Sequence, residues 1–158
     1  MKIKHLSLVI MFLFFIGGCF LSDNLDAVEP KSLTCTARLI VLHNGTQQNL
    51  TLTFIEQPKL SEGTVIIEGD LLVDNKPVGI INRSIEYVFS HQDINYSFVS
   101  KKITSQKGET VTKRQLEDII PDFFLMTDAK MIYNVFSDKN SAVFSVGKTP
   151  RFYCAKLK

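Results

Sequence analysis

The three cysteines are the residues of this chain with the clearest chemistry. Cys19 lies in an apolar N-terminal segment, whereas Cys35 and Cys154 lie near the two ends of the remaining chain. A zinc site needs more ligands than two cysteines, and a redox pair is usually Cys-x-x-Cys. In an oxidising compartment two such residues pair, so we predict a structural disulfide between Cys35 and Cys154. Closing a loop of this length stabilises a fold by at most about 4–5 kcal/mol.

Other candidate catalytic or metal-binding residues lack a supporting pattern. The sequence has no Gly-x-Ser-x-Gly elbow, His-Glu-x-x-His motif or glycine-rich phosphate loop. His43 and His91 fall at predicted turns, where histidine is usually solvated, and neither has a metal-ligand spacing. Glu117, Asp118 and Asp122 surround a predicted helix end and are expected to face water. We therefore expect neither an enzyme nor a metal or cofactor site.

Arg83 has two interpretations. It shares a predicted strand face with Ile81, Ile85 and Tyr87. If that face is internal, the guanidinium needs an acidic partner or a bound anion, because an unpaired buried charge is costly. If the opposite face is internal, Arg83 lies in water.

The N-terminus has the pattern of an export signal. Lys2 and Lys4 precede an unbroken apolar run over residues 8–16, and the next charged residues are acidic. A basic region before a short apolar segment is typical of a signal peptide, with the positive end in the cytoplasm. Residues 1–21 are therefore predicted to be a signal peptide or signal anchor, residues 22–33 a tether and residues 34–158 a periplasmic domain.

The fate of this N-terminal segment is open. Ile16-Gly17-Gly18-Cys19 is similar to a bacterial lipobox, in which Cys19 would carry lipid. An uncleaved helix over residues 6–21 would reach only about 24 Å, which is short against a hydrocarbon core of about 30 Å. Cleavage by ordinary signal peptidase is the third alternative. In the first two cases the protein is attached to the membrane by its N-terminus.

Charge argues against a nucleic-acid partner. Without Lys2 and Lys4, 16 of the 18 basic residues remain, which equals the 16 acidic residues. The exported part is therefore neutral, and its basic residues are scattered. Nucleic-acid binding requires a basic face and an excess of positive charge, so we expect no such interaction.

Alternation with a period of two predicts most of the exported part to be β-strand. Strands are expected over residues 35–43, 49–56, 64–73, 78–89, 95–103, 130–136, 142–146 and 151–155. Asn44-Gly45 between the first two is a strong hairpin signal. Short turns between consecutive strands indicate an antiparallel meander. We therefore predict a mainly β fold, a lipocalin-like barrel or partly open barrel.

One helical segment interrupts the strands. Thr112-x-x-Gln115 is a capping box, Leu116, Ile119 and Ile120 lie on one helical face, and Pro121 ends the helix. The 128 residues beyond position 30 make one domain. Its many aromatic residues fill either a packed core or the wall of a cavity for a small apolar ligand.

Several motifs along the chain resemble the FidL-like proteins of enteric bacteria. They are the early Cys35, the segment Ile81-Asn82-Arg83-Ser84-Ile85, the helix end Ile120-Pro121-Asp122 and the ending Thr149-Pro150-Arg151-Phe152-Tyr153-Cys154. The resemblance covers the chain from its N-terminal segment to its C-terminus.

This resemblance implies a partner. FidL-like proteins are single-pass proteins that accompany a ToxR- or CadC-like regulator, a membrane protein with a cytoplasmic winged-helix domain and a periplasmic tail. The chain would then bind and stabilise or modulate such a regulator through its periplasmic domain. The two together would enclose a cavity for a small apolar, bile-salt-like molecule. A free-standing lipocalin-like carrier and an envelope lipoprotein are the alternatives.

Overall fold

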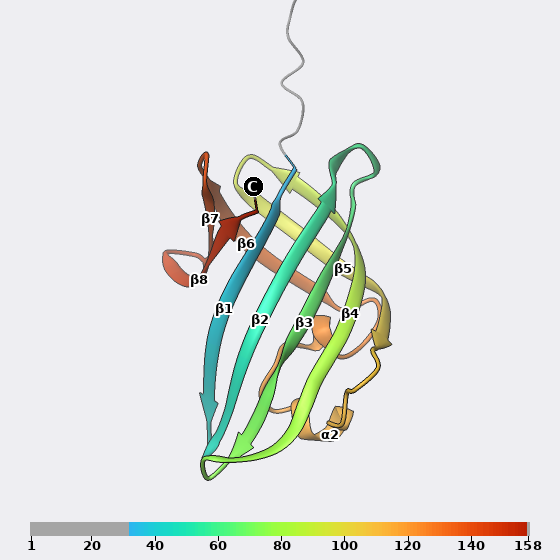
Figure 1. Ribbon diagram of the computed structural model, residues 1–158. Helices are drawn as coiled ribbons and strands as arrows, with labels where there is room; N and C mark the ends of the chain where they lie inside the picture. The colour runs from blue at the N-terminus through green and yellow to red at the C-terminus, as the bar shows by residue number, and fades with distance from the viewer. Residues whose placement is uncertain (1–31, 158) are drawn as a thin grey trace, which may run out of the picture.

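The computed structural model describes residues 32–157, which form a closed barrel of eight antiparallel strands (Figure 1). Each strand pairs with its neighbour in the chain, and β8 returns to β1. The strands are β1 (Thr34–His43), β2 (Thr46–Gln57), β3 (Glu62–Val73), β4 (Lys76–Gln92), β5 (Asn95–Ser105), β6 (Lys130–Ser137), β7 (Ser141–Val146) and β8 (Thr149–Lys156). The mainly β, barrel-like fold predicted from the sequence is confirmed.

Tight turns place consecutive strands side by side. Asn44 and Gly45, between β1 and β2, have φ values of 45° and 76°, and Asp74 and Asn75, between β3 and β4, have φ values of 50° and 62°. Such pairs of positive φ values match the twist of the flanking strands, and Asn, Asp and Gly tolerate them best. The hairpin predicted at Asn44-Gly45 is therefore present.

The alternation of the strands sorts their side chains between a core and an outer face. In β2, Leu50, Leu52 and Phe54 are buried, whereas Thr51 and Thr53 between them are partly exposed. Aromatic rings fill much of the interior, as in the stacked pair of Phe54 and Phe144, whose ring centroids are 5.2 Å apart. Within residues 32–157, most of the aromatic side chains thus belong to a packed core.

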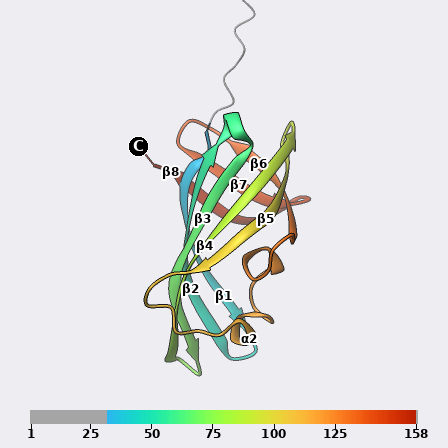
Figure 2. The same ribbon diagram turned by 90° about the vertical axis from the view of Figure 1, so that its right-hand side faces the viewer.

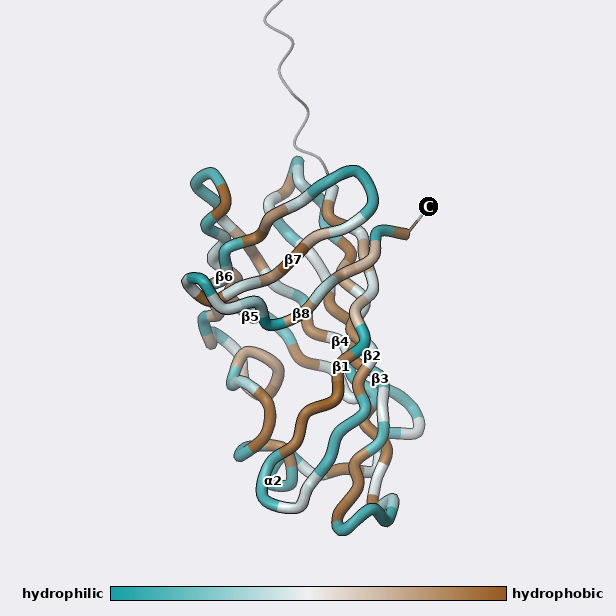
Figure 3. Tube along the Cα trace, turned by 90° about the vertical axis from the view of Figure 1, so that its left-hand side faces the viewer, coloured by the Kyte–Doolittle hydropathy of each residue, from teal (hydrophilic) through white to brown (hydrophobic). Residues whose placement is uncertain are grey.

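The barrel closes unevenly. β1 and β8 pair only through Cys35↔Lys156 and Thr36↔Ala155, at the upper end in Figure 1. Beyond Thr36 the remaining seven residues of β1 have no partner in β8. Figure 3 shows β7 and β8 crossing the upper half of the molecule while β1 continues below them. We call this opening between β1 and β8 the seam.

The segment between β5 and β6 covers the lower end of the barrel (Figures 1 and 2). It contains the one-turn helix α2 (Lys113–Leu116) and the 3-10 turn η2 (Asp122–Phe124). The capping box is present, because Gln115 Oε1 accepts hydrogen bonds from the backbone N–H and the hydroxyl of Thr112, both at 2.8 Å. The helix is shorter than the sequence predicts, since residues 117–120 continue as turns.

The interpretations of residues 1–21 as a signal or anchor, of Cys19 as a lipid attachment site and of most of the tether lie outside the described residues. Within residues 32–157 no helix is long and apolar enough to span a bilayer.

Candidate functional site

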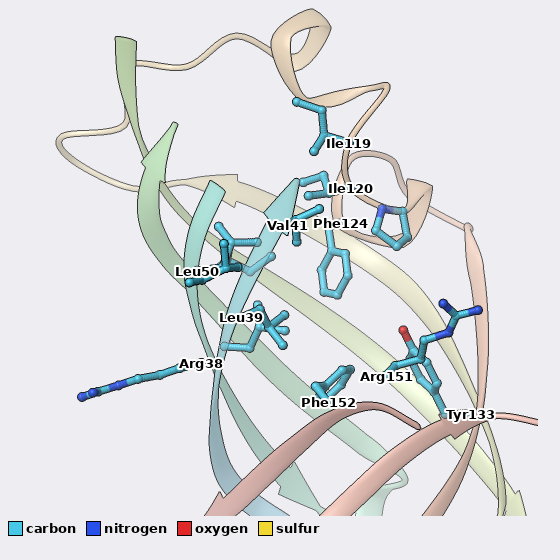
Figure 4. A pocket seen from close by; sticks show the side chains of 14 residues that line it. Arg38, Leu39, Val41, Leu50, Ile119, Ile120, Phe124, Tyr133, Arg151 and Phe152 are labelled. Atoms are coloured by element: carbon cyan, nitrogen blue, oxygen red, sulfur yellow. The ribbon is translucent and has the colours of Figure 1, made fainter. Parts of the chain in front are cut away.

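A mainly apolar pocket of about 430 Å³ opens beside the seam. β1 and β2 form one wall, β6 and β8 form another, and the segment between β5 and β6 forms the third (Figure 4). Its apolar lining comprises Leu39, Ile40, Val41, Leu50, Leu52, Ile67, Ile119, Ile120, Pro121, Phe124 and Phe152. A pocket of this size and composition suits a small apolar ligand.

Two polar residues lie on the β6–β8 side of this pocket. Tyr133 and Arg151 are neighbours in Figure 4, whereas Arg38 on the opposite wall points away from the pocket. Burial raises the pKa of the Tyr133 hydroxyl, and the nearby positive charge of Arg151 opposes that shift. Arg151 would therefore favour a ligand whose apolar body carries an anionic group.

A buried ion pair holds the third wall of the pocket in place. Arg83 on β4 donates from Nε and Nη2 to Glu109 Oε1, at 2.7 and 2.5 Å, and from Nη1 to the Phe124 carbonyl oxygen at 3.4 Å. The side chains of Arg83 and Glu109 are only 5% and 3% exposed. Arg83 thus lies on the internal face and has an acidic partner. Arg83 therefore links Glu109, near the start of the β5–β6 segment, to Phe124, which lies farther along the same segment and lines the pocket.

The seam leaves one edge of β1 without a partner strand. Thr34 accepts a hydrogen bond from the N–H of Leu157, so its backbone groups point toward β8. In an antiparallel ladder every second residue points the same way, so the backbone groups of Arg38, Ile40 and Leu42 also point into the seam. Within residues 32–157 no strand pairs with them.

The side chains along this edge are unusually apolar for a free strand. Ile40 and Leu42 are 69% and 71% exposed, and Leu39, Ile40 and Val41 line the pocket. Figure 3 shows the lower part of β1 as a hydrophobic stretch that ends at the polar turn. An exposed apolar edge strand is a template for the addition of another strand.

The predicted disulfide is present at the upper end of the seam. Cys35 on β1 and Cys154 on β8 are bonded, with their Cα atoms 5.4 Å apart and both residues fully buried. It joins β1 to β8 beside the two residue pairs that close the barrel. The cysteines therefore have a structural position and are not part of the pocket.

The remaining candidate residues are separated from the pocket. His43 and His91 are exposed, and His91 stacks on Tyr96 with ring centroids 4.8 Å apart. Glu117, Asp118 and Asp122 are exposed as predicted. No group of three or more His, Cys, Asp or Glu residues within residues 32–157 is arranged to hold a metal ion.

Comparison with known proteins assigns the chain to a family. The model of the YqeJ C-terminal domain matches residues 32–154, which cover nearly the whole barrel. The chain belongs to the YqeJ C-terminal domain family. It is also 27% identical over 153 residues to Uncharacterized protein YqeJ of Escherichia coli (strain K12), a match that covers 94% of this chain and 96% of the relative. The relation therefore extends beyond the barrel to the N-terminal segment.

Proposed function

We propose that this protein is the extracytoplasmic co-component of a membrane-bound regulator of the ToxR or CadC type, and that it binds the regulator's tail through the free edge of β1. The protein acts by binding, without catalysis, and its N-terminal segment attaches it to the periplasmic face of the cell envelope by a helix or a lipid. The observation that carries the proposal is the unpaired edge of Arg38, Ile40 and Leu42 next to an open pocket.

The chemistry of the seam defines the segment that it would accept. An added strand would pair with six backbone groups of β1, because three residues each present one N–H and one C=O. It would cover the exposed side chains of Ile40 and Leu42. The charged residues that flank the opening are Arg38 and Arg151, so an extended apolar segment with carboxylates at its flanks would fit best.

The resemblance to FidL-like proteins supports the choice of a regulator as the partner. Its most distinctive motif, Pro150-x-Phe152-x-Cys154, contributes a pocket wall through Phe152 and the seam disulfide through Cys154. The same motif thus contributes to the pocket and to the disulfide that joins β8 to β1 at the upper end of the seam.

Purification of the tagged full chain from membranes in mild detergent tests this proposal. Mass spectrometry is expected to find a stoichiometric membrane protein with a winged-helix domain. Ile40→Pro removes the N–H that points into the seam, which an edge strand tolerates, and should abolish co-purification. Ile40→Val keeps that N–H and should retain the partner. The proposal fails if the wild-type chain is recovered folded and alone.

A lipocalin-like carrier is the second candidate, and the apolar pocket is the observation that favours it. A carrier would bind an apolar probe in this pocket as a monomer, without a partner strand on the free edge of β1. Recovery of the folded chain without a partner, but with a bound lipid-like molecule, would support this function over the first.

A further inference from the structure

The short segment that leads into β1 is fastened to the barrel by one residue of β2. The backbone N–H of Leu33 donates to Glu56 Oε2 at 3.2 Å, and the hydroxyl of Ser32 donates to the Glu56 carbonyl oxygen at 3.1 Å. The Leu33 side chain is 4% exposed and belongs to the core. We call residues 32–34, which connect the N-terminal part of the chain to the barrel, the joint.

Glu56 is an unusual residue for this position. It is 6% exposed, and its second carboxyl oxygen, Oε1, is buried without a hydrogen-bond partner. No ion pair to Glu56 exists within residues 32–157. A buried carboxylate with a single N–H donor and no cation is costly, whereas a neutral carboxylic acid costs far less.

The groups that face Glu56 do not compensate its charge. Gly63 lies directly opposite on β3 and carries no side chain. On β4 and β5 the nearby titratable groups are Tyr87 and Tyr96. Burial raises the pKa of both hydroxyls, and the charge of Glu56 adds to that shift. The Tyr87 hydroxyl is itself buried without a partner. Burial raises the pKa of Glu56 to about 7, against the weaker opposing effect of the Leu33 N–H.

We propose that Glu56 is a proton-controlled latch for the joint. In its neutral form it stays buried and keeps the joint docked on the barrel. In its ionised form the buried carboxylate lacks hydration, and this cost favours an open joint in which water replaces the Leu33 N–H as its hydrogen-bond donor. The joint is therefore closed in mildly acidic surroundings and loosened in mildly alkaline ones.

The disulfide confines this movement to the joint. Cys35 follows the joint directly and is bonded to Cys154 on β8. Opening of Ser32 and Leu33 can thus proceed without separating β1 from β8. The consequence is that the joint loosens its contact with the barrel, while the pocket and the seam stay intact. The latch needs neither a partner nor a ligand and is independent of the proposed function.

Hydrogen–deuterium exchange on the full chain in detergent tests the latch. After correction for the intrinsic pH dependence of exchange, protection of the Leu33 amide should fall about tenfold or more between about pH 5.5 and pH 8.5. Glu56→Gln cannot ionise and should keep this protection at both pH values. Glu62→Gln, which changes an exposed acid at the same end of the barrel, should behave like the wild type.

Two results would overturn the proposal: pH-independent protection of the joint in the wild type, or the same pH dependence in Glu56→Gln. A second measurement covers the case in which Glu56→Gln folds poorly. The infrared spectrum of the wild type should contain a protonated carboxylic acid band near pH 6 that disappears by about pH 8.5. Absence of that band near pH 6 would also contradict the latch.

Discussion

Cys35 and Cys154 are bonded at the short stretch where β1 and β8 are paired, while below it the two strands separate and leave the pocket open. The disulfide therefore reinforces the closure of the barrel at the place where only two residue pairs join β1 to β8. It allows the rest of the seam to stay open without loss of the fold. A barrel with a fastened upper end and a free lower edge can bind a partner along that edge and keep its core.

Removal of the disulfide should destabilise the barrel and loosen the seam. The bond closes a loop with a sequence separation of 119 residues, and the double change Cys35→Ser and Cys154→Ser should lower the free energy of unfolding by about 2–5 kcal/mol. Denaturant unfolding measures this loss. Hydrogen exchange should increase most at Thr36 and Ala155, the pair next to the bond. A variant with unchanged stability would show that strand pairing alone closes the barrel.

Loss of one partner of the buried pair of Arg83 and Glu109 should lower the free energy of unfolding far more than loss of one partner of an exposed ion pair. Glu109→Gln leaves the Arg83 charge buried and uncompensated, which should cost about 3–5 kcal/mol of unfolding free energy. Glu86→Gln, which removes the exposed partner of Lys102 at 2.8 Å, should cost at most about 1 kcal/mol. Thermal unfolding of both variants measures the difference.

A double substitution separates the effect of the uncompensated charge from the effect of the lost hydrogen bonds. Arg83→Met with Glu109→Leu removes both charges and should recover much of the stability lost in Glu109→Gln. If this double variant is as unstable as Glu109→Gln, the pair is needed for its hydrogen bonds to the β5–β6 segment and not for charge compensation.

Gly63 provides the space that Tyr87 occupies. A Cβ atom at Gly63 would lie 2.5 Å from Cζ and Oη of Tyr87, which is too close for any side chain. Gly63→Ala should therefore lower stability by about 1–3 kcal/mol. Tyr87→Phe removes a buried hydroxyl without a partner and should be neutral or stabilising. Equal stability of Gly63→Ala and the wild type would contradict this packing.

The stability of the barrel should depend on pH through Glu56. Its pKa rises from 4.5 to about 7 on folding, so the folded chain keeps a proton that the unfolded chain releases over that range. The resulting stabilisation is complete below about pH 4.5 and is lost as the pH rises to about 7, by about 1 kcal/mol per pH unit. Urea unfolding across this range should show the slope in the wild type and not in Glu56→Gln.

The strands were predictable from sequence because each has its own local signal. Residues 49–56 alternate between buried and exposed side chains, and Asn44-Gly45 takes the turn that its residue types favour. The roles of Arg83, Glu56 and Gly63 depend on contacts between distant segments. Arg83 had two open interpretations because the face of β4 that turns inward is set by pairing with β3 and β5. Its partner Glu109 lies in a loop with no periodic signal.

A cavity for a small apolar ligand is one of the two alternatives that the sequence leaves open, but its lining is not predictable, because the pocket walls come from three separate parts of the chain. Phe152 and Arg151 lie in the C-terminal motif, Leu39 lies on β1, and Ile120 lies in the β5–β6 segment. Ile119 and Ile120 had a helical signal, but only α2 is helical and both residues follow it in turns. A sequence pattern cannot place such turns against the opposite strands.

Binding of small fluorescent probes should distinguish the apolar and charged parts of the pocket. The anionic 1-anilinonaphthalene-8-sulfonate and the neutral N-phenyl-1-naphthylamine have similar apolar bodies, and only the first carries a group that Arg151 can attract. Arg151→Met keeps most of the side-chain volume and should weaken binding of the anionic probe about 5- to 20-fold, as expected for one charge-assisted contact. Binding of the neutral probe should change little. Leu39→Trp should weaken both probes, because the larger ring occupies the pocket. Equal loss of both probes in Arg151→Met would show that Arg151 shapes the pocket wall and does not contribute through its charge.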